Sequence, residues 1–448
     1  MFGQLAAIAR NTFVESLRQP VFFILVMAGG GLQIVNTLLS AFTMGFTEET
    51  EVSGDDKLLF DMGLATIMVC ATLLASFIAT SVLSREIENK TALTVISKPV
   101  GRPAFVLGKY LGVAAAILVA TVILVVFFMF AIRHRVMSTA RDTIDGPVVF
   151  FSSLAVLLSI GLAIWGNYFY GWVFPSTAIG AMLPLVLLAY AGTLFVSKQW
   201  AFQPITTDLK PQIMIAAGVA VIAVMVLTAV AVAASTRLGQ VMTIVVCAGV
   251  FMLGLLSNHL LGRHAFRNAH IAIVDAVENP DELTLARAGD TLTIRLKAVP
   301  KVELAPGASL YYAPDPSGLA MAVPSHAPFA GDPGEARDVR GPDARPALVL
   351  AAPPDGVSLT LLNTGNLNVE RPPRPGDFVF TQPTQSNWAA RAAWSIVPNM
   401  QSFWLVDAVT QGHPIPPRYV ALVAGYGVVQ IAGFLALAVL MFQRRDVG

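Results

Sequence analysis

Long segments without a charged side chain make up much of this sequence, and they leave the chain few ways to fold. A helix needs about 20 mostly apolar residues to cross a bilayer, because backbone polar groups in hydrocarbon must be bonded within the helix itself. Only 13% of the 448 residues are charged and 55% are hydrophobic, which a water-soluble fold could not hide. Six segments qualify, with Asp61 as their only charged residue: Val21–Thr43, Leu59–Leu83, Tyr110–Ile132, Met214–Ser235, Val241–Leu261 and Val420–Phe442.

A further apolar stretch, Val148–Val196, is too long for one helix. Aromatic and glycine residues interrupt it at Gly166–Pro175. We interpret it as a hairpin of two spans, which raises the expected total to eight. The alternative is one span plus a re-entrant or interfacial segment, since Tyr and Trp favour the membrane boundary. The choice decides on which side of the membrane every later loop lies.

Basic residues in short loops indicate the orientation, because such loops favour the cytoplasm. Ser84–Lys109 is strongly basic and Thr47–Asp56 is acidic, so the first is expected inside and the second outside. With the hairpin counted, the turn Thr236–Gln240 and the basic tail Gln443–Gly448 also fall inside, and both chain ends are cytoplasmic. Two basic groups are exceptions on the expected outer side: Arg133, His134, Arg135 and Arg141 after the third span, and Arg263, His264 and Arg267 after the seventh.

The chain is thus expected to be an α-helical polytopic membrane protein in four parts. Residues 1–20 form an amphipathic interfacial elbow helix that Pro20 ends, and residues 21–261 form a transmembrane domain with a cytoplasmic loop at 84–109. Residues 262–417 form a soluble β-rich extracytoplasmic domain, and residues 418–448 hold the last span and the basic tail.

Within the β-rich part, short alternating runs between Pro/Gly turns predict strands. These runs are Thr291–Leu296, Ser309–Tyr312, Leu348–Leu350, Val357–Leu362 and Phe378–Thr381. We expect a loose loop over Pro324–Pro346 and a membrane-proximal amphipathic helix over Ser395–Val409.

No pattern in the sequence predicts catalysis. Phosphate-binding loops, H-E-x-x-H, paired C-x-x-C and G-x-S-x-G are all absent, and Cys70 and Cys247 lie in apolar runs. The net charge of +1 gives no field that would attract nucleic acid. The few polar residues in the spans, Gln33, Asn36 and His259, are interpreted as helix contacts. We therefore expect no enzyme activity in this chain, and no cofactor or metal.

The basic loop contains the most specific pattern. Arg85 to Ser97 can form a short charged helix that Pro99 and Pro103 end, before Phe105–Lys109 leads into the next span. The pattern R-E-x-E, followed by T-A-L-x-x-x-x-S-K-P-V-x-R and a G-K at the head of the span, resembles the coupling region of type-2 ABC transporter permeases. The elbow helix, the A-S-T-R-L turn at Ala234–Leu238, the P-N-x-Q-x-F-W stretch before the last span and the basic tail agree with it.

The resemblance implies the permease subunit of an ATP-driven exporter in the cytoplasmic (inner) membrane. Its partners would be a separate cytoplasmic ABC ATPase, membrane lipid, and a second copy of the chain or a related permease, with Gly29–Gly31 at the seam between them or marking a kink. The residues implied to contact the ATPase are Arg85, Glu86, Glu88, Lys98, Pro99 and Arg102.

The hairpin and the large outer domain depart from the usual six-span plan, so the resemblance says little about the cargo. The main alternative is a membrane sensor or scaffold whose outer domain binds a ligand or protein partner. An intramembrane enzyme is disfavoured, because the spans hold no polar constellation.

Overall fold

The computed structural model describes residues 2–40, 48–84, 101–136, 143–278, 285, 287–300, 302–317, 323–335, 345–366, 372–410 and 414–443. The chain forms two compact units. The helical unit comprises Met1–Leu255 and Pro398–Gly448, and the β unit comprises Leu256–Val397.

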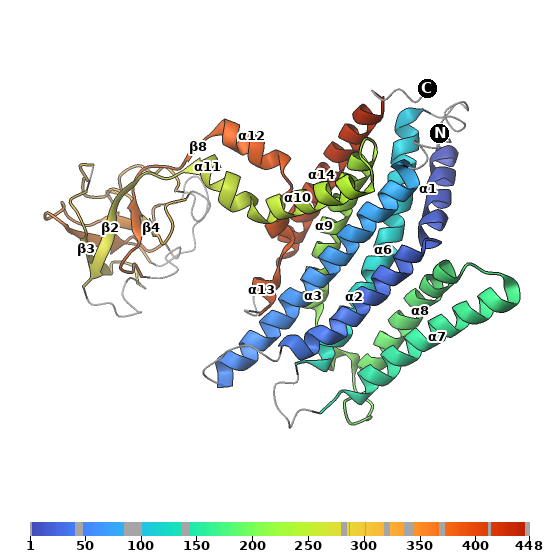
Figure 1. The fold of residues 1–448 in the computed structure, drawn as a ribbon. Coiled ribbons are helices and arrows are strands. Elements are labelled where there is room, and N and C mark those ends of the chain that lie inside the picture. The colour runs from blue at the N-terminus through green and yellow to red at the C-terminus, as the bar shows by residue number, and fades with distance from the viewer. Residues whose placement is uncertain are drawn as a thin grey trace. The chain divides into compact units, whose positions relative to one another are not determined.

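Long helices form the helical unit (Figure 1). They are α1 (Phe2–Leu17), α2 (Pro20–Leu39), α3 (Glu48–Ala79, continued by the π-helix η2, Thr80–Ser84), α6 (Arg102–His134), α7 (Gly146–Tyr170), α8 (Phe174–Phe195), α9 (Pro211–Ser235), α10 (Gln240–Ser257) and α14 (Pro417–Gln443). Shorter turns are η3 (Ile205–Thr207), η5 (Met400–Phe403) and α13 (Val406–Thr410). Eight helices in the described part of the chain are long and apolar enough to cross a membrane, which confirms the polytopic helical fold.

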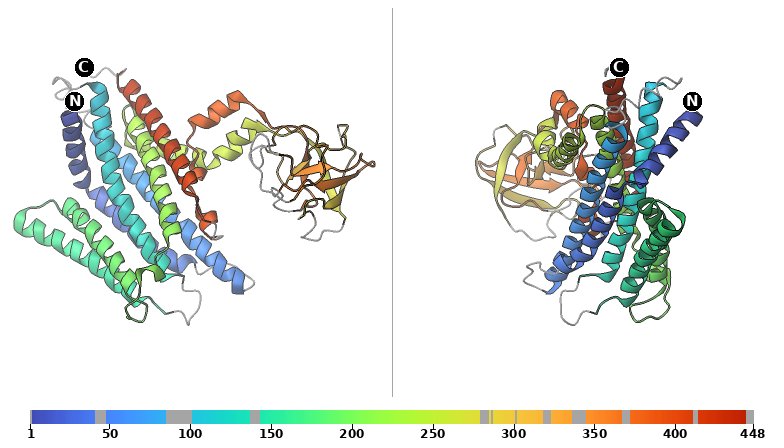
Figure 2. Two further views of the ribbon diagram at one scale, coloured as in Figure 1. Left: turned by 180° about the vertical axis from the view of Figure 1, so that it is seen from behind. Right: turned by 45° about the vertical axis from the view of Figure 1, so that its right-hand side comes forward.

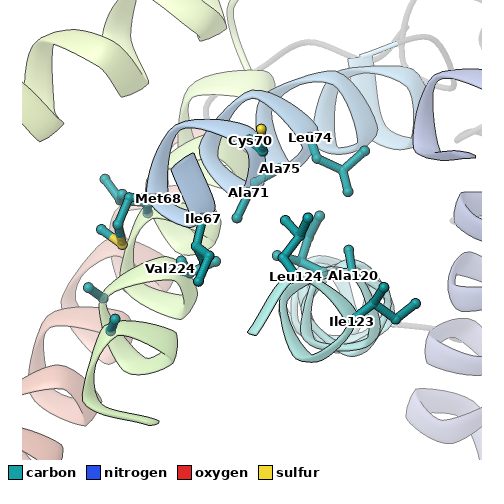
Figure 3. Packing of buried hydrophobic residues seen from close by; sticks show 14 of the residues in the cluster. Ile67, Met68, Cys70, Ala71, Leu74, Ala75, Ala120, Ile123, Leu124 and Val224 are labelled. Carbon is teal, nitrogen blue, oxygen red and sulfur yellow. The ribbon is translucent and has the colours of Figure 1, made fainter. Parts of the chain in front are cut away.

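Three of these helices, α3, α6 and α9, form the centre of the unit. In the most apolar 18-residue stretch of each helix, 67%, 72% and 67% of the residues of α3, α6 and α9 are buried, against 22% for α7 and 17% for α14. Figure 3 shows Ile67 and Leu74 of α3 packed with Leu124 of α6 and Val224 of α9. The outer helices therefore leave apolar side chains on the surface, where lipid or a partner would cover them.

The stretch Val148–Val196 is a hairpin of two helices, as predicted. Asp145 caps α7 by accepting a 3.1 Å hydrogen bond from Val148 N, and Gly171 ends α7 in the left-handed conformation with φ of 67°. The N–H of Gly171 donates to Asn167 O over 3.1 Å, and α8 begins two residues after Trp172. The two helices pack on each other (Figure 2).

The β unit contains a six-stranded antiparallel sheet in the order β4-β7-β2-β3-β6-β5. Its strands are β2 (His270–Val277), β3 (Thr291–Leu296), β4 (Tyr311–Ala313), β5 (Leu348–Leu350), β6 (Ser358–Asn363) and β7 (Phe378–Phe380), and a small second sheet pairs β1 (Phe266–Arg267) with β8 (Gln385–Ser386). All five predicted strands are present to within two residues at each end. The described parts of the expected loop, residues 324–335 and 345–346, contain neither helix nor strand.

The helix predicted over Ser395–Val409 is wrong. The structure has α12 (Trp388–Ile396), then η5 and α13. Pro398 lacks a donor for a continuing helix, and Asn399 caps η5 by accepting from Gln401 N over 3.1 Å. The apolar residues that suggested one helix belong to separate turns.

Candidate coupling site at one end of the helix bundle

Arg102 is the only one of the six predicted ATPase-contacting residues that lies in the described part of the chain. It is the first residue of α6, and its Nη1 donates a 2.8 Å hydrogen bond to the carbonyl of Gln443 at the end of α14. The other five, Arg85, Glu86, Glu88, Lys98 and Pro99, lie outside the described residues. The structure describes the contacts that hold Ser84 and Gly101, on either side of residues 85–100. We call these contacts, made by α1, η2, the start of α6 and the end of α14, the frame.

The last turn of α14 is packed against the start of α6. The rings of Phe105 and Phe442 are fully buried and stacked, with centroids 5.6 Å apart. The turn between α9 and α10 reaches the same place, because Arg237 Nε donates to Met441 O over 3.0 Å. The start of α6, the α9–α10 turn and the end of α14 therefore meet at one end of the bundle (Figure 2).

This meeting point supports the hairpin count independently. Helices α6, α7, α8 and α9 lie between Arg102 and Arg237. An even number of spans returns the chain to the side from which it started, whereas a re-entrant segment in place of the hairpin would put the two arginines on opposite sides.

Helix α1 is docked on α6 through small residues. A Cβ at Gly108 would lie 2.8 Å from Ile8 Cγ2, and one at Gly112 would lie 2.5 Å from the carbonyl oxygen of Ala9. Such G-x-x-x-G spacing lets two helices approach closely. On the facing side of α1, Thr12 and Ser16 are completely buried. The elbow helix is thus held by α6, while its predicted place on the membrane surface stays a prediction.

The helix that enters the loop is also tied to the elbow. After α3 the backbone continues as the π-helix η2, a form found often at functional sites. Gln19, just before α2, donates to the hydroxyl of Ser81 in η2. The helices on both sides of residues 85–100 are therefore connected to the α1–α2 segment.

At the opposite end of the bundle lies a buried ion cluster that the sequence did not predict. Arg133 Nε is 3.4 Å from a carboxylate oxygen of Asp145 and 3.4 Å from one of Asp208, and a guanidinium N–H donates to Val196 O. Arg133 and Asp145 side chains are only 5% and 0% exposed. The cluster joins the ends of α6, α7 and α8 to the segment before α9. It accounts for Arg133 as an exception to the basic-inside rule, because its charge is neutralised within the chain.

The P-N-x-Q-x-F-W stretch, Pro398–Trp404, is bound to the two helices α3 and α14. Trp404 Nε1 donates to Asp61 Oδ1 of α3 over 3.0 Å, and Asn399 N donates to Tyr426 OH of α14 over 2.8 Å. Phe403 is buried and stacks on Tyr426. Lys57, one helical turn before Asp61 on α3, forms a 2.7 Å ion pair with Asp407 of α13.

The polar residues inside the first span are helix contacts, as predicted. Gln33 Nε2 donates to Gly63 O over 2.9 Å, and Asn36 Nδ2 donates to Thr66 Oγ1 over 3.1 Å. His259 differs, because it is exposed. Within the described residues no group of three or more His, Cys, Asp or Glu side chains could hold a metal ion.

Two of the three consecutive glycines Gly29–Gly31 pack against other helices of this chain. A Cβ at Gly29 would lie 2.7 Å from Leu124, and one at Gly30 would lie 3.1 Å from Phe127. Only Gly31 faces open space. Gly29 and Gly30 therefore bring α2 close to α6 rather than to a second copy.

Comparison with known proteins agrees with this architecture. Residues 6–165 match the family model described as ABC-2 family transporter protein. This region contains most of α1, all of α2, α3 and α6, most of α7, and residues 84–109, which carry the resemblance. The match confirms the resemblance to an ABC-2-type permease. No curated protein and no solved structure matches the chain.

Proposed function

We propose that this chain is the membrane-spanning permease subunit of an ABC transporter that moves a substrate across the cytoplasmic membrane with ATP hydrolysed by a separate subunit. The observation that carries the proposal is the frame around residues 85–100. Four segments far apart in sequence, α1, η2, the start of α6 and the end of α14, are joined there by the contacts described above. A solvated linker would need no such frame.

The same contacts give a route for force. A push on residues 85–100 acts on η2 and on the first turn of α6. Through Phe105–Phe442 and the Arg102 hydrogen bond it reaches α14, and through Gly108 and Gly112 it reaches α1. Because packed helices move as rigid bodies, closure of two ATPases would tilt whole helices between inward-open and outward-open states.

In this arrangement Arg85, Glu86, Glu88, Lys98, Pro99 and Arg102 contact the ATPase. Both chain ends are cytoplasmic, the β-rich part is extracytoplasmic, and a second permease copy or a related chain completes the pathway. The frame and the family match support this proposal, since the basic loop and the closing contacts lie at the same end of the bundle.

Co-purification with ABC ATPases of the same genome, neighbouring genes first, tests the proposal. The double variant Glu86→Lys with Glu88→Lys should lose the ATPase while still migrating as a folded protein in size-exclusion chromatography, because charge reversal in the contact loop opposes docking. Glu278→Lys, an exposed acid in the β unit, is the matched control and should retain it. Unchanged ATPase recovery with the double variant would refute the coupling assignment.

A further inference from the structure

A cavity of about 710 Å³ lies in the β unit where the seventh candidate span ends. Its lining comes from η4 (Asn258–Gly262), from α11 (Arg263–Ala265) and from a turn after β4. The lining residues are Asn258, His259, Arg263, His264, Asp315, Pro316 and Ser317. A volume of this size suits a small polar ligand or a lipid headgroup.

The cationic side of the cavity is built around Arg263. Its Nε lies 3.1 Å from His264 Nε2 and its Nη1 lies 3.5 Å from His259 Nε2. Because a guanidinium can only donate, both imidazoles accept at Nε2 and carry their proton on Nδ1, where each ring is itself a donor. No carboxylate among the described residues lies within ion-pair distance of Arg263. The group is a set of N–H donors with one positive charge, which suits a phosphate.

The same cavity has a separate anionic side. One oxygen of Asp315 accepts from the N–H of Ser317 over 2.8 Å, which fixes the carboxylate in its own turn. No cation of the described chain forms an ion pair with it. A cavity with opposite charges that do not pair with each other matches a zwitterion better than a simple anion.

The surroundings of the cavity resemble a membrane interface. Leu256 and Leu260, one helical turn apart on the same face, are exposed just before Arg263. Helix α12 packs against η4 and α11 and presents Trp388 at 75% exposure, with the Arg391 guanidinium 4.8 Å from the indole centroid. An exposed Trp beside a half-buried Arg and apolar residues is typical of the depth at which headgroups lie.

We propose that this cavity binds the headgroup of a phospholipid that carries a primary ammonium. The phosphodiester lies against Arg263 and the two imidazoles, and the ammonium lies against Asp315. The acyl chains follow the apolar face of Leu256 and Leu260. This site is independent of the ATPase partner, and it explains why Arg263 and His264 stand on the expected outer side.

Lipid titration of the delipidated full-length protein in detergent, followed by native mass spectrometry, tests the proposal. The probes are phosphatidylethanolamine, phosphatidylglycerol, which lacks the ammonium, and free phosphoethanolamine as competitor. Arg263→Gln should weaken binding of both lipids at least tenfold. Asp315→Asn, which keeps the turn acceptor, should weaken phosphatidylethanolamine at least threefold and leave phosphatidylglycerol unchanged. Arg295→Gln, an exposed arginine on β3, is the control and should change neither.

Several outcomes would overturn the proposal. Equal phosphatidylethanolamine affinity of wild type and Arg263→Gln would refute the phosphate site. An equal loss of affinity for both lipids in Asp315→Asn would refute the ammonium site. Full competition by free phosphoethanolamine would show that the ligand is soluble and not a lipid. If Arg263→Gln does not fold, the proposal is tested by Asp315→Asn alone, which should bind phosphatidylethanolamine more weakly than wild type and phosphatidylglycerol equally well.

Discussion

Replacing Asp145 with asparagine separates two roles that the native side chain combines. Asparagine can still accept from Val148 N and cap α7, but it no longer offers a negative charge to Arg133. Removing one partner of a buried ion pair costs about 3–5 kcal/mol, because the remaining charge is left uncompensated. Asp208 still lies 3.4 Å from Arg133 Nε, so we expect a cost near the lower end, about 3 kcal/mol. Asp145→Ala should lose about 1 kcal/mol more, since the cap is lost as well.

A double-mutant cycle isolates the charge pair. The double variant Arg133→Met with Asp145→Asn leaves no unpaired buried charge from this pair. Its loss of unfolding free energy should therefore be about 2 kcal/mol smaller than the sum of the losses of the two single variants. The assay is loss of helical circular dichroism in mixed micelles as denaturing detergent is added. Strictly additive costs, or an Asp145→Asn cost below about 0.5 kcal/mol, would show that the cluster does not hold these helix ends together.

Three further predictions concern other parts of the molecule. Gly112→Leu should displace α1 at a cost of about 1–3 kcal/mol, because its Cβ would meet the backbone of Ala9, and should speed tryptic cleavage at Arg10, whereas Gly161→Leu, with nothing within 4 Å, should not. Trp404→Phe should lower the free energy of unfolding by about 1.5 kcal/mol through loss of the bond to Asp61, and an unchanged value would contradict the anchoring role. Burial raises the pKa of Tyr311 to about 12. An unfolded tyrosine ionises near pH 10, so the free energy by which neutral Tyr311 favours the folded state is fully present below about pH 10 and is lost as pH rises to about 12. Tyr311→Phe should therefore reduce the drop in unfolding midpoint between pH 9 and pH 11. An equal drop in the variant and the wild type would refute the raised pKa of Tyr311.

The sequence predicted what depends on local pattern. Apolar length alone identified the spans, and the alternation of Thr291–Leu296 matched β3 residue for residue. The strand His270–Val277 was missed because its register shifts twice, between His270 and Ala272 and between Val274 and Ala276, which disrupts the period of two. The longest strand of the sheet is therefore the one whose pattern is least regular.

Contacts between residues far apart in the chain could not be predicted from local sequence patterns. Arg133 was recognised as out of place, but its partners Asp145 and Asp208 lie in two different later segments, and nothing local selects them. Likewise, Trp404 was noticed within its motif, while the bond to Asp61 depends on how the chain returns to α3. Of the predicted coupling residues, sequence placed Arg102 in the loop before the span Tyr110–Ile132, whereas the structure places it at the first position of α6 and joins it to Gln443.

The contacts at the end of α14 have a consequence for biogenesis. Phe442, Met441 and Gln443 complete the frame of contacts at the start of α6, yet they are synthesised only after the whole β unit. Helices α1 to α9 can enter the membrane before α14 is made, but the frame at the start of α6 stays open until α14 inserts. A chain truncated before Pro417 lacks these contacts, so the end of the bundle around Arg102 is closed only once α14 has been synthesised and packed.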